Sequence, residues 1–273
     1  MLILKLTIMP NMLFKSLLLF FTLIISSLIY ADGEQNIDQP LVFTVGVENT
    51  NKLPLYGVNE KGEFCGLYRK ILDKFASDNN VKFIYKPFKI NELFNNFYDA
   101  KIDFKFPDNP SWRAADKRAF SIVYSLPLYL YVEALFVKPS DLNKSIDKFN
   151  FIGLVGDVAL WSIHHYIEVN RISIKRNQCK KLIKQLFASE IEGIMCNYFV
   201  MKNSLRELGL EDRLVPNFNL PHIDDYYYFS TIKHPDIINN FNIWLKQHKD
   251  DIHNCHLKYY SINKPKENEC IFK

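Results

Sequence analysis

The chain has 273 residues, 48% of them apolar, a globular composition whose length suits either one large domain or two lobes. Its formal net charge is +4, from 34 basic and 30 acidic residues, and it has no stripe of basic and aromatic residues, so we exclude a nucleic-acid partner. The spacing of its five cysteines fits no zinc pattern, so we expect no bound metal, and nothing in the sequence indicates a cofactor.

Residues 1–31 have the order of a secretory signal peptide. Lys5 and Lys15 supply a positive n-region, residues 17–29 form an unbroken run of apolar and small residues, and polar character begins after Ala31. We therefore predict cleavage after Ala31 and a mature protein that works outside the cytoplasm. A complete signal also follows Met12, so either Met1 or Met12 can be the start.

A permanent membrane anchor is the alternative use of this segment. Residues 13–30 are almost long enough to span a bilayer, since a spanning helix needs about 20 apolar residues. We favour cleavage because a small residue and then a polar stretch follow the run. No later segment approaches this length, so we expect the rest of the chain to be soluble.

Strands and helices alternate in two successive units along the remaining chain. The first unit has predicted strands at residues 41–47, 81–85 and 102–106 and predicted helices at 67–75 and 90–98. After an extended run at 132–137, the second unit has predicted strands at 151–155, 172–176 and 193–196 and helices at 158–169, 180–187 and 200–208. Gly209 is expected to stop the last of these helices. An extended run at 226–232 and a helix at 235–249 complete the pattern. This alternation predicts an α/β protein with mostly parallel sheets flanked by helices.

Several short motifs follow one another in a fixed order over essentially the whole mature chain. They are residues 43–47 with Pro54 and 62–67, then 101–103, then Lys117-Arg118 with Tyr124-Ser125-x-Pro127-x-Tyr129, then 151–157, 182–197 and the helix from Pro235. In this order they resemble the extracytoplasmic (periplasmic) solute-binding proteins of family 3, the amino-acid receptors of ABC transporters.

The resemblance implies a two-lobed type II periplasmic-binding-protein fold with two extended hinge crossovers. Residues 38–134 with 232–273 would form lobe 1, and residues 135–231 would form lobe 2. The hinge strands are expected near residues 132–137 and 228–232. Ligand would bind between the lobes and shift the population toward a closed state.

The same resemblance implies a function without catalysis. The protein is expected to be a periplasmic monomer that captures a small polar ligand, an amino acid or a related organic acid, and presents it to an ABC permease in the membrane. Two alternatives stay open. One is a cyclohexadienyl-dehydratase-like enzyme on the same scaffold, which needs a general acid in the cleft. The other is an orphan sensory or interaction module.

The candidate for gripping a ligand carboxylate is an arginine. Arg118 stands where the family places this residue, and a planar guanidinium can donate two parallel hydrogen bonds to a carboxylate. Arg113 is a rival, because Ala115 replaces the hydroxyl residue that the family usually has three positions before the arginine. Trp112 can either line the pocket wall or pack in the core.

Further candidates stand near predicted strand ends, where such sheets bind ligands. Glu48 follows the first strand, and Tyr56 is a candidate aromatic wall. In the second lobe, backbone amides at Gly156 and Asp157 can take an anionic oxygen, but the Asp157 carboxylate would repel one and has a good use as a helix N-cap.

Asn197 is the most informative departure from the family pattern. Amino-acid receptors usually carry an Asp at this strand end, and it pairs with the α-ammonium of the ligand. Asn keeps an acceptor but lacks the charge, so selectivity for a zwitterion should weaken. Asp224 and Asp225 could supply a replacement carboxylate, or they could be a solvated loop pair.

An exported chain with five cysteines can form two disulfides and leave one cysteine over. Cys255 and Cys270 bracket the polar tail, so we favour that pair. Cys179 and Cys196 are a second candidate pair.

Overall fold

The computed structural model describes residues 39–156, 165, 167–169 and 172–260. The predicted signal peptide, most of the helix predicted at residues 158–169, Asp157 and Cys270 lie outside the described residues. Within the described part, Cys255 is disulfide-bonded, whereas Cys65, Cys179 and Cys196 are free thiols.

Each half of the molecule is built on three parallel strands, as the sequence predicted. In the first half, β1 (Leu41–Glu48) pairs with β5 (Val81–Phe88) and β6 (Phe104–Asp108). In the second half, β9 (Phe151–Leu154) pairs with β10 (Ser173–Arg176) and β11 (Gly193–Asn197). Because the strands of each half are parallel, their carboxyl ends meet at one edge, where ligands bind in sheets of this kind.

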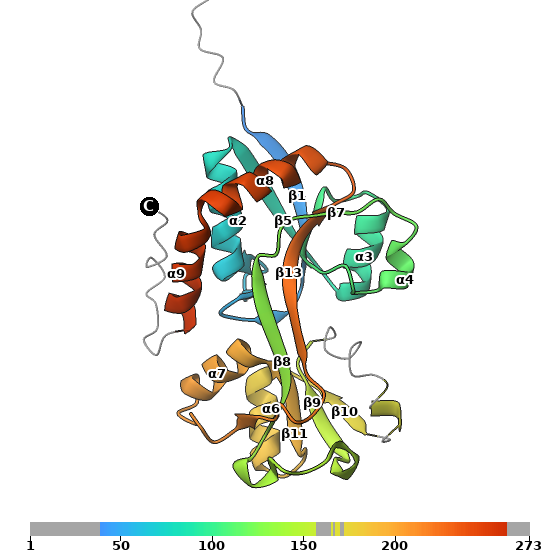
Figure 1. Ribbon diagram of the computed structural model, residues 1–273, viewed down its shortest axis with the longest axis vertical. Helices are drawn as coiled ribbons and strands as arrows, with labels where there is room; N and C mark the ends of the chain where they lie inside the picture. Colours follow the sequence, from blue (N-terminus) through green and yellow to red (C-terminus); the bar gives the residue numbers. More distant parts are fainter. Residues whose placement is uncertain (1–38, 157–164, 166, 170–171, 261–273) are drawn as a thin grey trace, which may run out of the picture. The chain divides into compact units, whose positions relative to one another are not determined.

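Two long strands run between the halves, as Figure 1 shows. They are β8 (Tyr129–Val137) and β13 (Ile223–Thr231), which pair with each other in antiparallel register. β8 also pairs with β11, and β13 with β6, so the order is β10-β9-β11-β8-β13-β6-β1-β5. These strands cover the residues at which hinge crossovers were predicted, and the lobe boundaries stay a prediction.

Helices with one apolar face pack on the strands of each half. The first half has α2 (Leu67–Asp78), α3 (Ile90–Tyr98), α8 (Pro235–Gln247) and α9 (Lys249–Tyr260), and the second has α6 (Cys179–Phe187) and α7 (Tyr198–Glu207). The prediction of a single helix at 235–249 was wrong at its end. The backbone leaves the helical conformation at His248, and α9 continues from there in a new direction (Figure 1).

Several short elements carry no periodic signal in the sequence. They are β2 (Asn51–Lys52), β3 (Tyr56–Val58), β4 (Phe64–Cys65), α4 (Ala114–Lys117), β7 (Val123–Tyr124), β12 (Val215–Pro216) and the 3₁₀ turns Pro139–Asp141 and Ile146–Lys148. β2, β3 and β4 form a separate small sheet, which follows the carboxyl end of β1 and positions part of the site described below.

The two halves have cores of different composition. The first-half core is rich in aromatic side chains and includes Tyr56, Tyr227 and Trp112, whereas the second half packs aliphatic side chains with the sulfur atoms of Cys179 and Cys196. Among the residues that the structure describes, no helix combines the length and the apolar character needed to cross a membrane.

Candidate functional site

In the described part of the chain, every fully buried acidic, lysine or arginine side chain belongs to one region. Three are acidic and three are basic: Glu48, Asp108, Glu133, Lys52, Lys105 and Lys117. They come from the end of β1, from β6, β2 and α4, and from the linking strand β8. Buried charges are costly unless they are paired, so their concentration at the strand ends marks this region as the candidate site. Their formal charges cancel.

Lys52 and Glu133 form an ion pair across 81 residues of sequence. Lys52 Nζ donates to Glu133 Oε1 at 3.0 Å, and the two side chains are 1% and 0% exposed. Burial by itself lowers the pKa of Lys52, but attraction to Glu133, Tyr227 and Glu48 exceeds this effect and raises the pKa well above its usual value. Lys52 is therefore a permanent cation.

Asp108, at the end of β6, holds two lysines at once. Its Oδ1 accepts from Lys105 Nζ at 2.8 Å and from Lys117 Nζ at 2.6 Å, and its Oδ2 accepts from the Ser230 hydroxyl at 2.7 Å. Burial and the neighbouring Lys117 lower the pKa of Lys105 to about 8, against the attraction of Asp108 and Glu48. Since Glu48 acts on both Lys52 and Lys105, it connects the two charge groups.

Asn197 and Glu133 are direct register partners where β11 meets β8. Asn197 caps α7, since its Oδ1 accepts from the backbone amides of Phe199 and Val200 at 3.0 and 3.4 Å. Its Nδ2 and Glu133 Oε2 are both buried and have no hydrogen-bond partner in the described structure. In the described part of the chain, neighbouring strands thus each carry a buried polar atom without a hydrogen-bond partner, which natural proteins rarely leave without a role.

A cavity of about 730 Å³ opens between residues of the two halves. Five carboxamide side chains line it, together with Thr50, one acidic residue (Glu60) and one arginine (Arg176); the carboxamides are Asn49, Asn51, Asn59, Asn177 and Gln178. Gly156 also lines this cavity. A Cβ at Gly156, which has φ of +76°, would lie 3.1 Å from Lys52 Cε, so the glycine separates the cavity from the buried ion pair.

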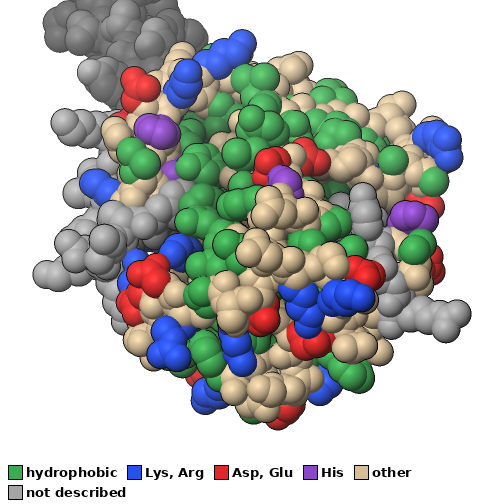
Figure 2. Space-filling model, turned by 60° about the horizontal axis from the view of Figure 1, so that its bottom comes forward, with side chains coloured by type: hydrophobic (Ala, Val, Ile, Leu, Met, Phe, Trp, Pro, Cys, Tyr) green, Lys and Arg blue, Asp and Glu red, His purple; other side chains and the backbone are tan. Residues whose placement is uncertain are grey.

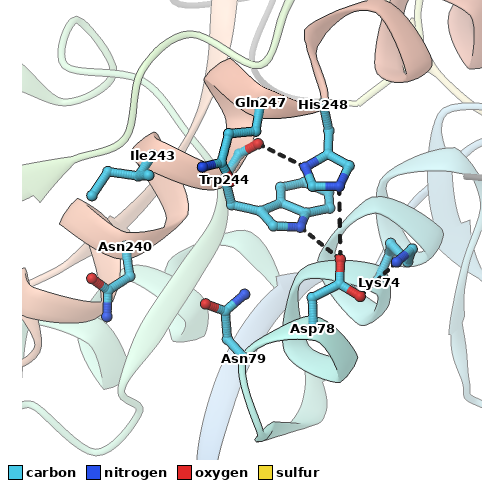
Figure 3. Close-up of a pocket in the computed structure, with 8 residues that line it drawn as sticks. All are labelled: Lys74, Asp78, Asn79, Asn240, Ile243, Trp244, Gln247 and His248. Atoms are coloured by element: carbon cyan, nitrogen blue, oxygen red, sulfur yellow. Dashed lines mark hydrogen bonds and ion pairs between the residues drawn. The ribbon is translucent and has the colours of Figure 1, made fainter. Parts of the chain in front are cut away.

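A second cavity, of about 450 Å³, lies on the first half between α2 and α8 (Figure 3). Its polar groups mostly satisfy one another. Trp244 Nε1 donates to Asp78 Oδ2 at 2.8 Å, and His248 stacks on the Trp244 ring at 4.4 Å. The first cavity is therefore the better candidate site, because residues of both halves line it and its Gly156 lies against the buried Lys52 side chain.

Neither predicted arginine is among the buried charges, although Arg113 lies over the Phe94 ring that also contacts Lys105 and Lys117. Arg118 is exposed at the end of α4, and its neighbour Lys117 is the buried cation of that turn. Arg113 is half-buried in a left-handed conformation, donates to Asn91 Oδ1 and lies over the Phe94 ring at 4.5 Å. A carboxylate-gripping role for either residue stays a prediction.

Four of the other predicted residues lie in or against the charged region. Glu48 is buried at the end of β1, Gly156 lines the cavity, and Asn197 adjoins Glu133. Tyr56 is fully buried in edge contact with Tyr227 at 5.6 Å between ring centroids.

Two further predicted residues have structural partners. Trp112 packs in the core, where its Nε1 donates to Tyr131 Oη at 3.1 Å. Asp225 is half-buried on β13, where its Oδ1 accepts from the Tyr226 backbone amide at 2.8 Å. Asp157 is outside the described residues.

Of the six buried charges, sequence reasoning predicted only Glu48 as a site residue. It missed Lys52, Lys105, Asp108, Lys117 and Glu133. Lys105 and Glu133 stand inside apolar strands, a pattern that could have marked them, since a charged residue in a buried strand needs a partner. Lys52 lies in a short polar loop and gives no such signal. Within the described ranges, no three His, Cys, Asp or Glu side chains are grouped to hold a metal.

The surface shows no field of a single charge sign on the face drawn in Figure 2, where basic and acidic side chains are mixed.

Comparisons with known proteins establish the fold. No protein-family model and no curated protein matches the chain. An ancestral arginine-binding protein bound to arginine has a TM-score of 0.64 at 16% identity, over 82% of this chain and 100% of that one. A Streptococcus pneumoniae ABC uptake transporter substrate-binding protein with bound histidine has a TM-score of 0.62 at 12% identity, over 80% and 92%. A histidine kinase sensor domain with similarity to periplasmic binding proteins has a TM-score of 0.61 at 14% identity, over 84% and 100%.

Proposed function

We propose that this chain, which has the two-lobed fold of periplasmic amino-acid-binding proteins, is an extracytoplasmic receptor for a small polar solute. The observation that carries the proposal is the cavity of about 730 Å³, which residues of both halves line and which Gly156 separates from the buried Lys52 side chain. A ligand that contacts both halves stabilises the arrangement in which they meet. The predicted export signal and the motif order support a receptor that works outside the cytoplasm and serves an ABC permease, and the resemblance to family 3 implies that it acts as a monomer.

The charges of the site indicate a ligand that carries no net charge. The six buried charges already cancel, so a charged ligand would have no buried counterion left to pair with and would lose its hydration. The cavity lining offers mainly carboxamides, with one acidic and one basic residue. Neutral zwitterions and amides fit these groups better than dicarboxylates or cationic amino acids do.

Isosteric ligand pairs test this proposal. The purified mature protein is titrated by calorimetry, and its melting temperature is measured, with glutamine against glutamate and with citrulline against arginine. We expect the neutral member of a pair to raise the melting temperature and to bind at least about tenfold more tightly, a difference of about 1.4 kcal/mol. Tighter binding of glutamate or arginine would contradict the ligand class, and no binding across the panel would count against a receptor.

Matched amide variants locate the ligand. Gln178→Ala removes a carboxamide from the cavity of about 730 Å³, and Gln247→Ala removes one from the second cavity, between α2 and α8. We expect only Gln178→Ala to weaken binding, by about 2- to 10-fold, because a hydrogen bond contributes about 0.5–1.5 kcal/mol. Equal effects from the two variants would place the ligand elsewhere.

A sensory or interaction module is the second candidate, and one observation favours it. Lys52 already occupies Glu133, so the chain's own side chain fills the place that a ligand cation would take. The likeness to a kinase sensor domain is compatible with this use. A chain that binds no member of the panel but captures a membrane protein other than a permease would support the sensory function.

A further inference from the structure

Cys179 and Cys196 come together in the second half from two adjacent elements. Cys179 is the first residue of α6, and Cys196 is the penultimate residue of β11. Their Sγ atoms lie 3.8 Å apart, and Met201 Sδ lies 3.9 Å from Cys179 Sγ. Because the thiols already touch, a disulfide requires only a short further approach, to an S–S length of about 2.05 Å.

The two thiols differ in acidity. A hydrogen bond from Cys196 lowers the pKa of Cys179, with further help from Ser204 and Lys180 against the effect of burial. Burial and the neighbouring Cys179 raise the pKa of Cys196. Cys179 also begins a helix, a position that favours a thiolate. The pair thus combines a nucleophilic sulfur with a protonated partner that can attack second.

The two thiols also differ in access. A cavity of about 280 Å³ is lined by Cys179 together with Ser204 and Asn51, and Cys196 is not part of its lining. Cys179 is 6% exposed and Cys196 is 0% exposed. Cys179 is therefore the more accessible of the two thiols, and a small reagent that enters this cavity meets it first.

We propose that Cys179 and Cys196 form a thiol–disulfide exchange site that reacts with low-molecular-weight disulfides. The Cys179 thiolate attacks one sulfur of the small disulfide, which releases the first thiolate and leaves a mixed disulfide on Cys179. Cys196 then loses its proton and attacks Cys179 Sγ, which releases the second thiolate. Two protein thiols are oxidised to one disulfide, and one small disulfide is reduced to two thiols.

The new bond would act on the ligand cavity. Gln178, which precedes Cys179, lines both the 730 Å³ and the 280 Å³ cavities, and Asn197 follows Cys196 beside Glu133. A disulfide joins the start of α6 to the end of β11 and so restrains both residues. Oxidation is expected to change the affinity of the cavity if the proposed receptor function holds, but the exchange chemistry does not depend on that function.

Linkage mapping tests the exchange site directly. The mature protein, with its thiols reduced, is incubated with oxidised glutathione, alkylated, digested and analysed by mass spectrometry. We expect a peptide pair joined through Cys179 and Cys196. The same pair found in protein as isolated would also support the site. Both thiols remaining open to alkylation at equilibrium with excess oxidised glutathione would overturn the proposal.

Trapping establishes the order of attack. Cys196→Ser is expected to accumulate a glutathione adduct on Cys179, about tenfold faster than on Cys65 in the same sample. Cys65 is the internal control, because it is more exposed, but burial raises its pKa and its Sγ donates to the Gly57 carbonyl at 3.6 Å. Faster reaction of Cys65 would overturn the assigned role of Cys179. Should Cys196→Ser fail to fold, the time course of the mixed disulfide in the wild-type protein gives the same comparison.

Discussion

Lys52 and Lys105 are both fully buried near the same strand ends, yet their pKa values move in opposite directions. Lys52 pairs with Glu133 and also feels Glu48 and Tyr227, which raises its pKa. Lys105 shares the single carboxylate of Asp108 with Lys117, and its pKa falls to about 8. The two sites differ in their ratio of acids to lysines rather than in burial.

This difference shows how one region can hold six buried charges. Near Lys52 the acids outnumber the lysine, and around Asp108 the lysines outnumber the acid. With Glu48 counted beside Lys52 and Glu133, that group has one excess negative charge and the Asp108 group has one excess positive charge, so the six formal charges sum to zero. Removal of one charge therefore affects the whole set.

The largest expected effect is that of Asp108→Asn. The change leaves Lys105 and Lys117 buried without the carboxylate that they share. We expect the free energy of unfolding to fall by about 5 kcal/mol, the upper end of the range for breaking a buried pair. Urea unfolding followed by circular dichroism measures this. Adding Lys105→Met to the variant should restore part of the loss, and no recovery would show that the two lysines do not repel each other.

Glu133→Gln is expected to cost less, about 3 kcal/mol. Lys52 loses its nearest acid but keeps the attraction of Glu48. The matched control is the double variant Lys52→Met with Glu133→Leu, which replaces the whole pair by apolar side chains and should be more stable than Glu133→Gln. Equal stability of the two variants would mean that the unpaired ammonium group carries no penalty.

The lowered pKa of Lys105 predicts a dependence of stability on pH. Between about pH 8 and the ordinary lysine value of 10.5, the unfolded chain holds a proton on Lys105 that the folded chain has released, so rising pH favours the folded chain. Relative to Lys105→Met, the wild type should gain up to about 1.4 kcal/mol per pH unit in this range. Urea unfolding at a series of pH values measures the difference, and a constant difference would contradict the lowered pKa.

The smallest effect is expected for an ion pair at the surface. Lys101 Nζ lies 2.7 Å from Asp99 Oδ2, a shorter distance than in the Lys52–Glu133 pair, but both side chains are more than half exposed. Lys101→Met should change the free energy of unfolding by less than about 1 kcal/mol, because water and salt screen the exposed charges. A loss as large as that of Glu133→Gln would show that distance matters more than burial.

The sequence predicted those parts of the fold that repeat a local pattern. The apolar spacing of residues 90–98 predicted α3 with both of its ends, and the β-branched run at 41–47 predicted β1 to within one residue. Gly209 stops a helix with φ of +64°, as expected. These local patterns indicate which face of a helix or strand is buried, and they can be recognised without knowing which other elements that face packs against.

The candidate site followed the sequence less closely. Glu48, Gly156 and Asn197 could be predicted from their places at strand ends, whereas Trp112 packs in the core and Arg118 is exposed. Lys117 beside Arg118 is buried instead. A helix of four residues is too short for the spacing of its apolar residues to show which face is buried. The sequence therefore could not say whether Lys117 or Arg118, at the end of α4, points inward.

By itself, the sequence determined the class of the protein: two α/β units in order, expected to follow a signal for export, with a set of motifs in the order of a known receptor family. Only the tertiary structure decided which charges meet. Lys52 and Glu133 are 81 residues apart, and Glu133 and Asn197 meet only because β8 and β11 are antiparallel neighbours. Pairing at such separations depends on how the strands assemble, since a buried charge is tolerated only where another element brings its partner.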